Sequence, residues 1–192
     1  MPAELTKLIG KRDEEACVAF TKEVERLGFE RTRKKLWVRL HAHTADVLHI
    51  HRDGISYGAP LNASVSLRLH LAIRVLNDSF PSLHLNGPDT DGAPREGRYH
   101  LRFNAESLDS FDRCVGDLAR YVREIGEPWF LQFRDAGALL GPGGSPLSTD
   151  SQTSLRAALD GRASADALAL TAKELGLNRR RTAPGGPSTS RR

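Results

Sequence analysis

The sequence has few of the residues and runs that mark several large classes of protein. It contains two cysteines in 192 residues, too few for the disulfide framework of a small secreted domain. Cys17 and Cys114 fall on the buried stripe or edge of two separate predicted helices, so we expect reduced, packed thiols in preference to a disulfide or a reactive pair. No apolar run is long enough to span a bilayer, and the first ten residues lack the apolar core of a signal peptide. These absences favour a cytoplasmic protein with no membrane partner.

Motifs of the common catalytic and cofactor sites are also missing. The chain has no dinucleotide-binding glycine fingerprint, no zinc-finger spacing and no phosphate-binding loop, because no Lys-Ser or Lys-Thr follows the glycine-rich segment 141–146. No Ser-His-Asp or Cys-His arrangement is evident, and no paired carboxylates indicate hydrolysis. The sequence therefore indicates no cofactor, no resident metal and no catalytic residue, and a non-enzymatic protein is the default expectation.

The basic charge of the chain is concentrated at its C-terminal end. The formal net charge is +4 at pH 7, from 28 Lys and Arg against 24 Asp and Glu. Five arginines and no acid lie in residues 179–192, which leaves 23 basic against 24 acidic residues in the rest of the chain. A nucleic-acid interaction must therefore be argued from where the charges lie.

Alternating apolar and polar residues predict a β-hairpin. Successive side chains of a strand point to opposite faces, and the runs 36–41 and 47–51 both have apolar residues at even positions. Residues 44–46 are the expected turn, because a three-residue loop places the two apolar sides on one face. The predicted cross-strand pairs are His43–Val47, His41–His49 and Arg39–His51.

Residues 64–73 and 98–103 repeat this alternation, which predicts a four-stranded antiparallel sheet with one covered face and one solvated face. Asp53 is the only obvious acid on the solvated face. That face is predicted to carry six of the seven histidines, four arginines and a tryptophan in phase with them: His41, His43, His49, His51, His70, His100, Arg39, Arg68, Arg98, Arg102 and Trp37.

Two helices are expected to cover the apolar face. The first has Asp13 as its cap, the apolar positions Cys17, Phe20, Val24 and Leu27, and Gly28 past its end. The second has Ser107 as its cap and apolar residues at steps of three and four from Leu108 to Ile125, and Gly126 and Pro128 should stop it. Helices on one face of an antiparallel sheet make an α+β two-layer sandwich.

The predicted organisation divides the chain into four parts. Residues 1–140 form the α+β domain, and residues 77–97 are a long loop within it that suits a binding or lid segment or an inert insertion. Residues 141–151 are a Gly/Pro/Ser linker. Residues 152–177 are a helical appendage with short helices at 155–159 and 164–175, the second with an apolar stripe of Leu168, Ala172 and Leu175 and with Gly176 at its end. Residues 178–192 are an arginine-rich tail that we expect to be disordered.

One stretch resembles a known family. A helix ending in Leu27-Gly28-Phe29 precedes the basic run 31–35, the hairpin and the strand from Val65. His100-Leu-Arg-Phe103 and a long helix leading into Gly126-Glu-Pro-Trp-Phe130 follow. This order, over residues 17–140, resembles the bacterial domain of unknown function 4304. The resemblance implies an α+β fold with a curved antiparallel sheet. It implies no activity and no functional residues, because none is assigned to the family.

The histidine- and arginine-rich face has several interpretations. It could be a solvated face that discourages aggregation. It could bind a polyanion such as RNA or DNA, since arginine and protonated histidine contact phosphate and stack on bases. His-x-His pairs also suit zinc, although four arginines would repel a cation.

Two further interpretations involve activity or a protein partner. A metal-independent ribonuclease of toxin type would use His41 and His49 as base and acid, with arginine stabilising the phosphorane. An immunity- or antitoxin-like domain would present the face to an acidic protein partner. Binding of a polyanion is our leading expectation for a function.

Overall fold

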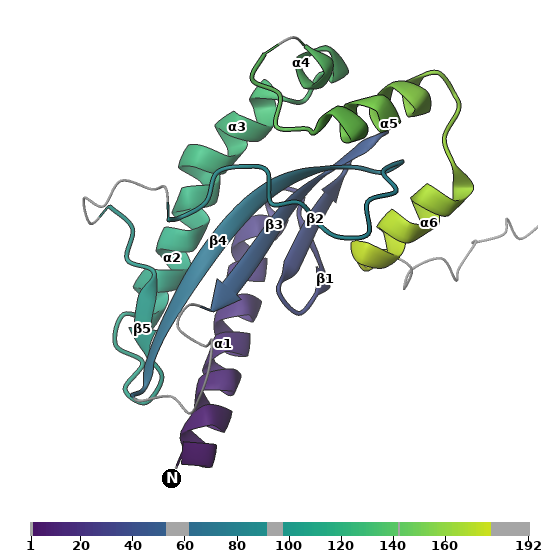
Figure 1. The fold of residues 1–192 in the computed structure, drawn as a ribbon. Helices are drawn as coiled ribbons and strands as arrows, with labels where there is room; N and C mark the ends of the chain where they lie inside the picture. The colour runs from purple at the N-terminus through teal and green to yellow at the C-terminus, as the bar shows by residue number, and fades with distance from the viewer. Residues whose placement is uncertain (1, 53–61, 92–97, 142, 178–192) are drawn as a thin grey trace, which may run out of the picture.

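The computed structural model describes residues 2–52, 62–91, 98–141 and 143–177, which form an α+β structure around one antiparallel sheet (Figure 1). Its strands follow one another across the sheet in chain order. They are β1 (Glu30–Arg33), β2 (Leu36–Leu40), β3 (Thr44–Arg52), β4 (Ser64–Val75) and β5 (Arg102–Asn104). The predicted class is confirmed, but the sheet has five strands and not four, because the basic run after Phe29 forms β1. Asp53 and the segment 178–192 lie outside the described residues.

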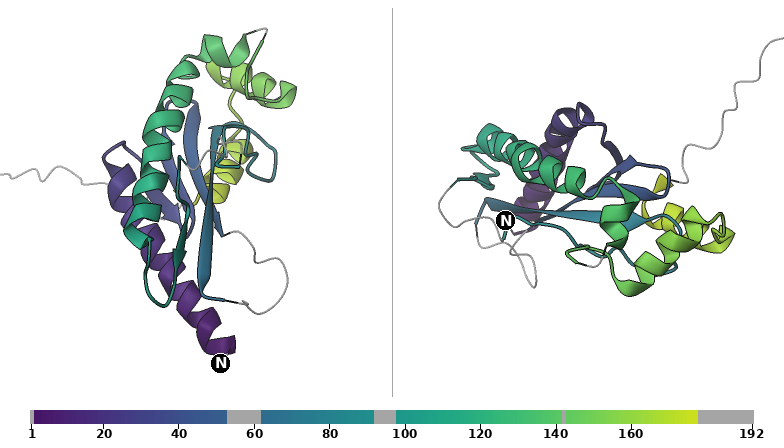
Figure 2. Two further views of the ribbon diagram at one scale, coloured as in Figure 1. Left: turned by 90° about the vertical axis from the view of Figure 1, so that its left-hand side faces the viewer. Right: turned by 90° about the horizontal axis from the view of Figure 1, so that it is seen from above.

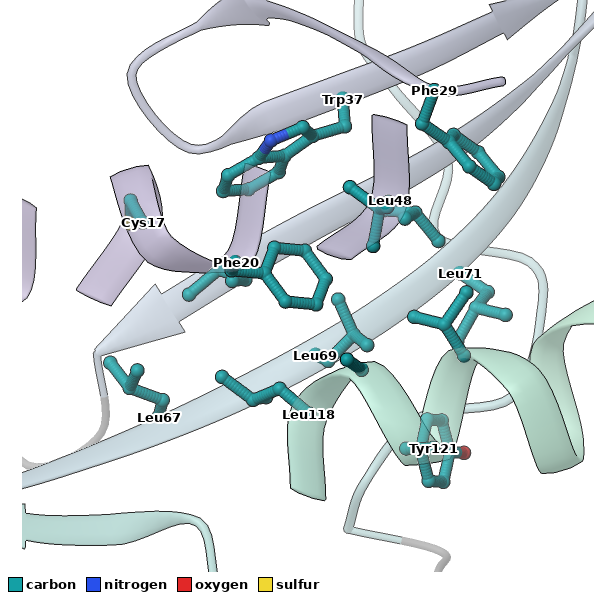
Figure 3. Close-up of a cluster of buried hydrophobic side chains, with 14 of the residues drawn as sticks. Cys17, Phe20, Phe29, Trp37, Leu48, Leu67, Leu69, Leu71, Leu118 and Tyr121 are labelled. Atoms are coloured by element: carbon teal, nitrogen blue, oxygen red, sulfur yellow. The ribbon is translucent and has the colours of Figure 1, made fainter. Parts of the chain in front are cut away.

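Helices α1 (Pro2–Glu25) and α2 (Phe111–Tyr121) cover one face of the sheet, here called the first face (Figure 2). Their apolar stripes meet the inward side chains of β2, β3 and β4 in one core, which includes Phe20, Trp37, Leu48, Leu69 and Leu118 (Figure 3). Most of the predicted stripe residues are buried or partly buried against this core, but Leu108, predicted as the first of the second stripe, is 38% exposed and lies before α2. Gly28 has φ +86° and ends the turn after α1, which is the conformation that glycine adopts without strain.

The predicted helix starts were wrong. Helix α1 begins at Pro2, and Asp13 lies inside it, buried, with its carboxylate 2.7 Å from Lys35 Nζ. Helix α2 begins at Phe111, because Leu108 and Ser110 both have positive φ values. Ser107 lies before this turn and accepts a hydrogen bond from the backbone N–H of Asp109. A helix cap is predicted from a few neighbouring residues only. Here Asp13 forms an ion pair inside α1 and Ser107 belongs to the turn before α2, so neither residue caps a helix.

The predicted stop after α2 was also wrong. Helix α2 continues through a π-helical turn, η1 (Val122–Gly126), into α3 (Glu127–Gln132). Pro128 lies in the first turn of α3, where its missing N–H costs little. A Cβ on Gly126 would lie 2.8 Å from Leu71 Cδ2. This glycine therefore lets the helix approach β4 closely and does not end it.

The register of the first hairpin corrects the predicted pairing. Val38 is opposite Val47, Leu40 is opposite Ala45, and His41 N–H donates to Thr44 O across a two-residue turn. The turn is therefore shorter than predicted, and every residue of β2 moves to the other face. Trp37, not Leu36 or Val38, points into the core, where its Nε1 donates to Thr21 Oγ1 at 2.9 Å.

Leu36 and Val38 are nevertheless buried, because the opposite, second face is partly covered as well. Helices α4 (Ala136–Leu140), α5 (Thr149–Leu159) and α6 (Ala165–Glu174) follow α3, and α6 lies across the second face (Figure 2). Leu175, directly after α6, packs there against Leu36, Val38 and Val47. Gly176 follows with φ +73° and ends this helix as predicted. Of the predicted stripe Leu168–Ala172–Leu175, however, Leu168 is 41% exposed.

The part of the 77–97 loop that the structure describes is attached to β4 on the edge away from β3. Asn86 exchanges two hydrogen bonds with the backbone of Ile73. Leu71 N–H donates to Pro88 O, and Thr90 N–H donates to Leu69 O. The segment 86–90 therefore extends the sheet beyond β4 for a short distance and places Asp89 directly beside His70.

Candidate functional site

Three of the six predicted histidines meet on the second face, on the half that α6 does not cover. His49 on β3 and His70 on β4 are direct cross-strand partners. The rings of His49 and His51 are 4.0 Å apart between centroids, and those of His51 and His70 are 4.9 Å apart, both in edge contact. All three side chains are partly exposed. We call these three residues the histidine cluster.

Charged residues surround the histidine cluster. Arg68 lies opposite His51 on β4, and its guanidinium is 2.8 Å from Asp91. Asp89 Oδ2 lies 3.7 Å from His70 Nδ1. Nothing in the sequence pattern places these two acids at the site, because the loop that carries them has no periodicity. Lys35 precedes β2 and was also missed; it is paired with Asp13 of α1.

Burial and like charge disfavour the protonation of His49 and His51. Burial lowers the pKa of His49 to about 4, and the charges of His51, His70 and Lys35 act in the same direction. The pKa of His51 is also lowered, first by burial and then by His70, Lys35 and Arg68. His49 Nδ1 is buried and has no hydrogen-bond partner among the described residues. A proton added to this cluster is therefore costly unless negative charge arrives with it.

Trp37, Arg39 and His41 do not belong to this surface, contrary to the prediction. Arg39 is largely buried on the first face, where it pairs with Asp46 at 2.9 Å and with Glu127 at 3.0 Å. His41 Nε2 lies 2.8 Å from the same Asp46 carboxylate. Trp37 is fully buried in the core. The predicted pairs His41–His49 and Arg39–His51 are therefore wrong, and both follow from the incorrect turn length.

The remaining predicted residues lie away from the cluster. His43 is in the hairpin turn. The backbone N–H of His100 donates to Asp117 of α2, and Arg98 pairs with Glu124. Arg102 on β5 is opposite Ser66 and so shares the second face with Arg68, farther along the sheet. The structure thus brings together His49, His51, His70 and Arg68, with Arg102 beyond them.

Three other features of the described residues bear on function. No three His, Cys, Asp or Glu side chains in the described part of the chain are arranged to hold a metal ion. Both cysteines are free and buried, and burial raises the pKa of Cys17 to about 11 and that of Cys114 to about 12, so neither is a reactive thiolate. No helix in the described ranges has the length and apolarity to cross a membrane.

No family model, curated protein or solved structure matches this chain. The resemblance to the domain of unknown function 4304 therefore stays a prediction. Function has to be argued from the surface itself.

Proposed function

We propose that this chain is a binding domain that holds a polyanion, single-stranded RNA or DNA, on the histidine cluster and Arg68. One observation carries the proposal: three imidazoles from neighbouring strands are in ring contact, with an arginine opposite the middle one. Imidazole and guanidinium are flat groups that stack on bases and donate to phosphate oxygens.

The acids at the border limit the size of the interface. Asp89 and Asp91, in the segment 86–91, form an acidic border beside Arg68 and His70 of β4. On the other side of the cluster, α6 covers the opposite half of the second face. A nucleic-acid backbone is repelled by the first boundary and excluded sterically by the second. A single strand that crosses β3 and β4 fits between them, whereas a duplex needs a wider basic surface.

Binding of a strand should depend on pH. The pKa of His49 and that of His51 are both lowered, so these residues carry little charge at pH 7. Bound phosphate raises their proton affinity, and by linkage a lower pH raises the affinity for phosphate. We therefore expect tighter binding at pH 6 than at pH 8.

The test is fluorescence anisotropy with a labelled single-stranded RNA at pH 6 and pH 8. The protein is the full chain with the five arginines of residues 179–192 changed to serine, so that this segment adds no positive charge. The double variant His51→Gln/His70→Gln should lose binding by about tenfold or more, the loss expected when charge-assisted contacts are removed. The matched control is His43→Gln, a histidine in the hairpin turn. Equal affinity of all three proteins would refute the proposal.

A metal-independent ribonuclease is a second candidate for the same surface. The observation that favours it is the contact of His51 with His70, since two adjacent imidazoles with Arg68 nearby match the base, acid and charge stabiliser that 2′-hydroxyl attack requires. Gel analysis of the RNA after the anisotropy run, with EDTA present, tests it. Cleavage that disappears in His51→Gln supports an enzyme, and intact RNA leaves binding alone.

A further inference from the structure

We propose that the histidine cluster recognises the terminal phosphate of a nucleic-acid strand in preference to its internal phosphodiesters. The inference rests on the proposed function and specifies the group that the surface binds. The geometry of the cluster, its charges and the different roles of its three rings each support it.

The cluster is compact. Its three rings lie on two adjacent strands and span two side-chain positions, with centroid separations of 4.0 and 4.9 Å. Neighbouring strands are about 4.8 Å apart, and alternate residues of a strand are about 7 Å apart. An area of this size holds one phosphate group. It does not follow a backbone over several nucleotides.

The charges around the cluster favour a group with more than one negative charge. Arg68 on β4 shares the face of the rings, whereas Lys35 before β2 is paired with Asp13 of α1 and acts on His51 only through its charge. Asp89 and Asp91 on the 86–91 segment and Asp13, paired with Lys35, offset part of this charge. A terminal phosphate carries about −1.5 to −2 at pH 7, whereas each internal diester carries a single negative charge. The terminal group is therefore compensated better by Arg68 together with a protonated His51.

The three histidines have different roles. The Nδ1 atom of His49 is buried without an acceptor among the described residues, so its proton would have no partner there, and its low pKa agrees with a neutral ring. His49 is thus a positioning residue that packs edge-on against His51. His51 and His70 are the rings whose N–H groups donate hydrogen bonds to phosphate oxygens. No covalent step is involved, and each proton comes from solvent.

The experiment compares one labelled RNA sequence with a 5′-phosphate, with a 3′-phosphate, or with hydroxyls at both ends, bound to the unaltered 192-residue chain at pH 6.5 and pH 8. We expect one phosphorylated form to bind about tenfold or more tightly than the hydroxyl form at pH 6.5, since one more compensated charge in a partly buried site has an effect of this size. The preference should shrink at pH 8. It should also vanish in His51→Gln and in His70→Gln, and persist in His43→Gln.

The outcomes distinguish a failure of terminal-phosphate recognition from a failure of the proposed strand binding. If phosphorylated and hydroxyl strands bind equally well, recognition of the terminus is wrong and the polyanion surface stands. If no strand binds, both are wrong. Inorganic phosphate and adenosine monophosphate serve as competitors. If either one binds as tightly as the strand, the ligand is a free phosphate compound and the assignment to a strand is wrong.

The variants also need a readout beyond affinity, because a misfolded protein would lose binding for a trivial reason. Proton and carbon spectra of the imidazole groups, recorded with and without the phosphorylated RNA that binds more tightly, report the protonation of each ring. Binding should move the midpoint of His51 upward and leave His49 neutral. An unchanged midpoint of His51 in a protein that binds the strand would contradict the proton uptake.

Discussion

At the scale of single residues, His49 links the stability of the fold to pH. Its pKa is lowered to about 4 by burial, whereas an unfolded histidine titrates at about 6.5. The unfolded chain therefore binds the extra proton between these values, and the folded state is destabilised as pH falls from about 6.5 toward 4. Above pH 6.5 the His49 ring is neutral in both the folded and the unfolded state, so it no longer makes the free energy of unfolding depend on pH.

We predict that His49→Phe makes the free energy of unfolding less dependent on pH in this window. Allowing for partial exposure of the ring, the wild type should lose about 1–2 kcal/mol more than the variant between pH 7 and pH 5. Urea denaturation at the two pH values measures this difference, and carboxylates that titrate in the same range cancel in the comparison. Identical losses would show that His49 titrates normally.

Arg39 is the residue whose role differs most from the prediction. Its guanidinium is largely buried, ion-pairs with Asp46 and Glu127, donates to Leu27 O, and stacks 4.5 Å from the ring of Phe29. Removing one partner of a buried pair leaves the other charge without compensation. We therefore predict that Arg39→Met destabilises the protein by about 3–5 kcal/mol, measured by urea denaturation.

The control for this prediction is Arg98→Met, which removes an exposed pair with Glu124 and should leave the free energy of unfolding nearly unchanged. The double variant Arg39→Met/Asp46→Asn should recover part of the loss, because it no longer buries an unpaired carboxylate. A small effect of Arg39→Met would mean that solvent reaches Asp46.

At the scale of elements, α6 determines how much of the second face is available. Leu175, directly after its last turn, is fully buried in the small cluster with Leu36, Val38 and Val47. Glu174 of α6 pairs with the buried Arg74 of β4 at 2.9 Å, and Thr171 donates to Asp78 O. The helix is thus fixed by one apolar contact and a polar network at the end of β4.

We predict that Leu175→Ala costs about 2–4 kcal/mol, the usual effect of removing a buried leucine side chain. Leu168→Ala in α6 is the control, since its side chain is 41% exposed and should change stability by less than about 0.5 kcal/mol. Hydrogen exchange should be faster in α6 of the first variant only. Equal effects of the two substitutions would show that α6 is not held by Leu175.

The elements also show where reading the sequence succeeds. The apolar stripe of α2 was predicted correctly because 3.6-residue periodicity is a local property. The hairpin register depends on one residue in the turn, and that error moved Trp37, Arg39 and His41 to the wrong face. The alternation itself is ambiguous in β2, since Leu36, Trp37 and Val38 are all buried. A helix from much later in the chain covers the second face, and no pattern within β2 indicates it.

At the scale of the whole molecule, positive charge is unevenly divided along the chain. Residues 1–178 have nearly equal numbers of acids and bases, and residues 179–192 carry five arginines. Alternation in the sequence predicted that His49, His51, His70 and Arg68 share one face. The register between β3 and β4 keeps them on the same face. The acidic border of the histidine cluster came from the 77–97 loop, whose path depends on hydrogen bonds to β4 that have no sequence signature.

This division predicts two separable responses of binding to a single-stranded RNA. Removing one phosphate contact lowers the slope of log affinity against log salt by about 0.7, so changing the five C-terminal arginines to serine should flatten the slope by several times that amount. The change of affinity between pH 8 and pH 6 should stay the same, because it arises in the histidine cluster. His51→Gln/His70→Gln should do the reverse, keeping most of the salt slope and losing the pH response. Anisotropy over a salt series at both pH values measures the two effects in one protein set. If the arginine-to-serine variant loses its pH response as well, the histidines do not contact phosphate, and the arginines account for the whole interaction.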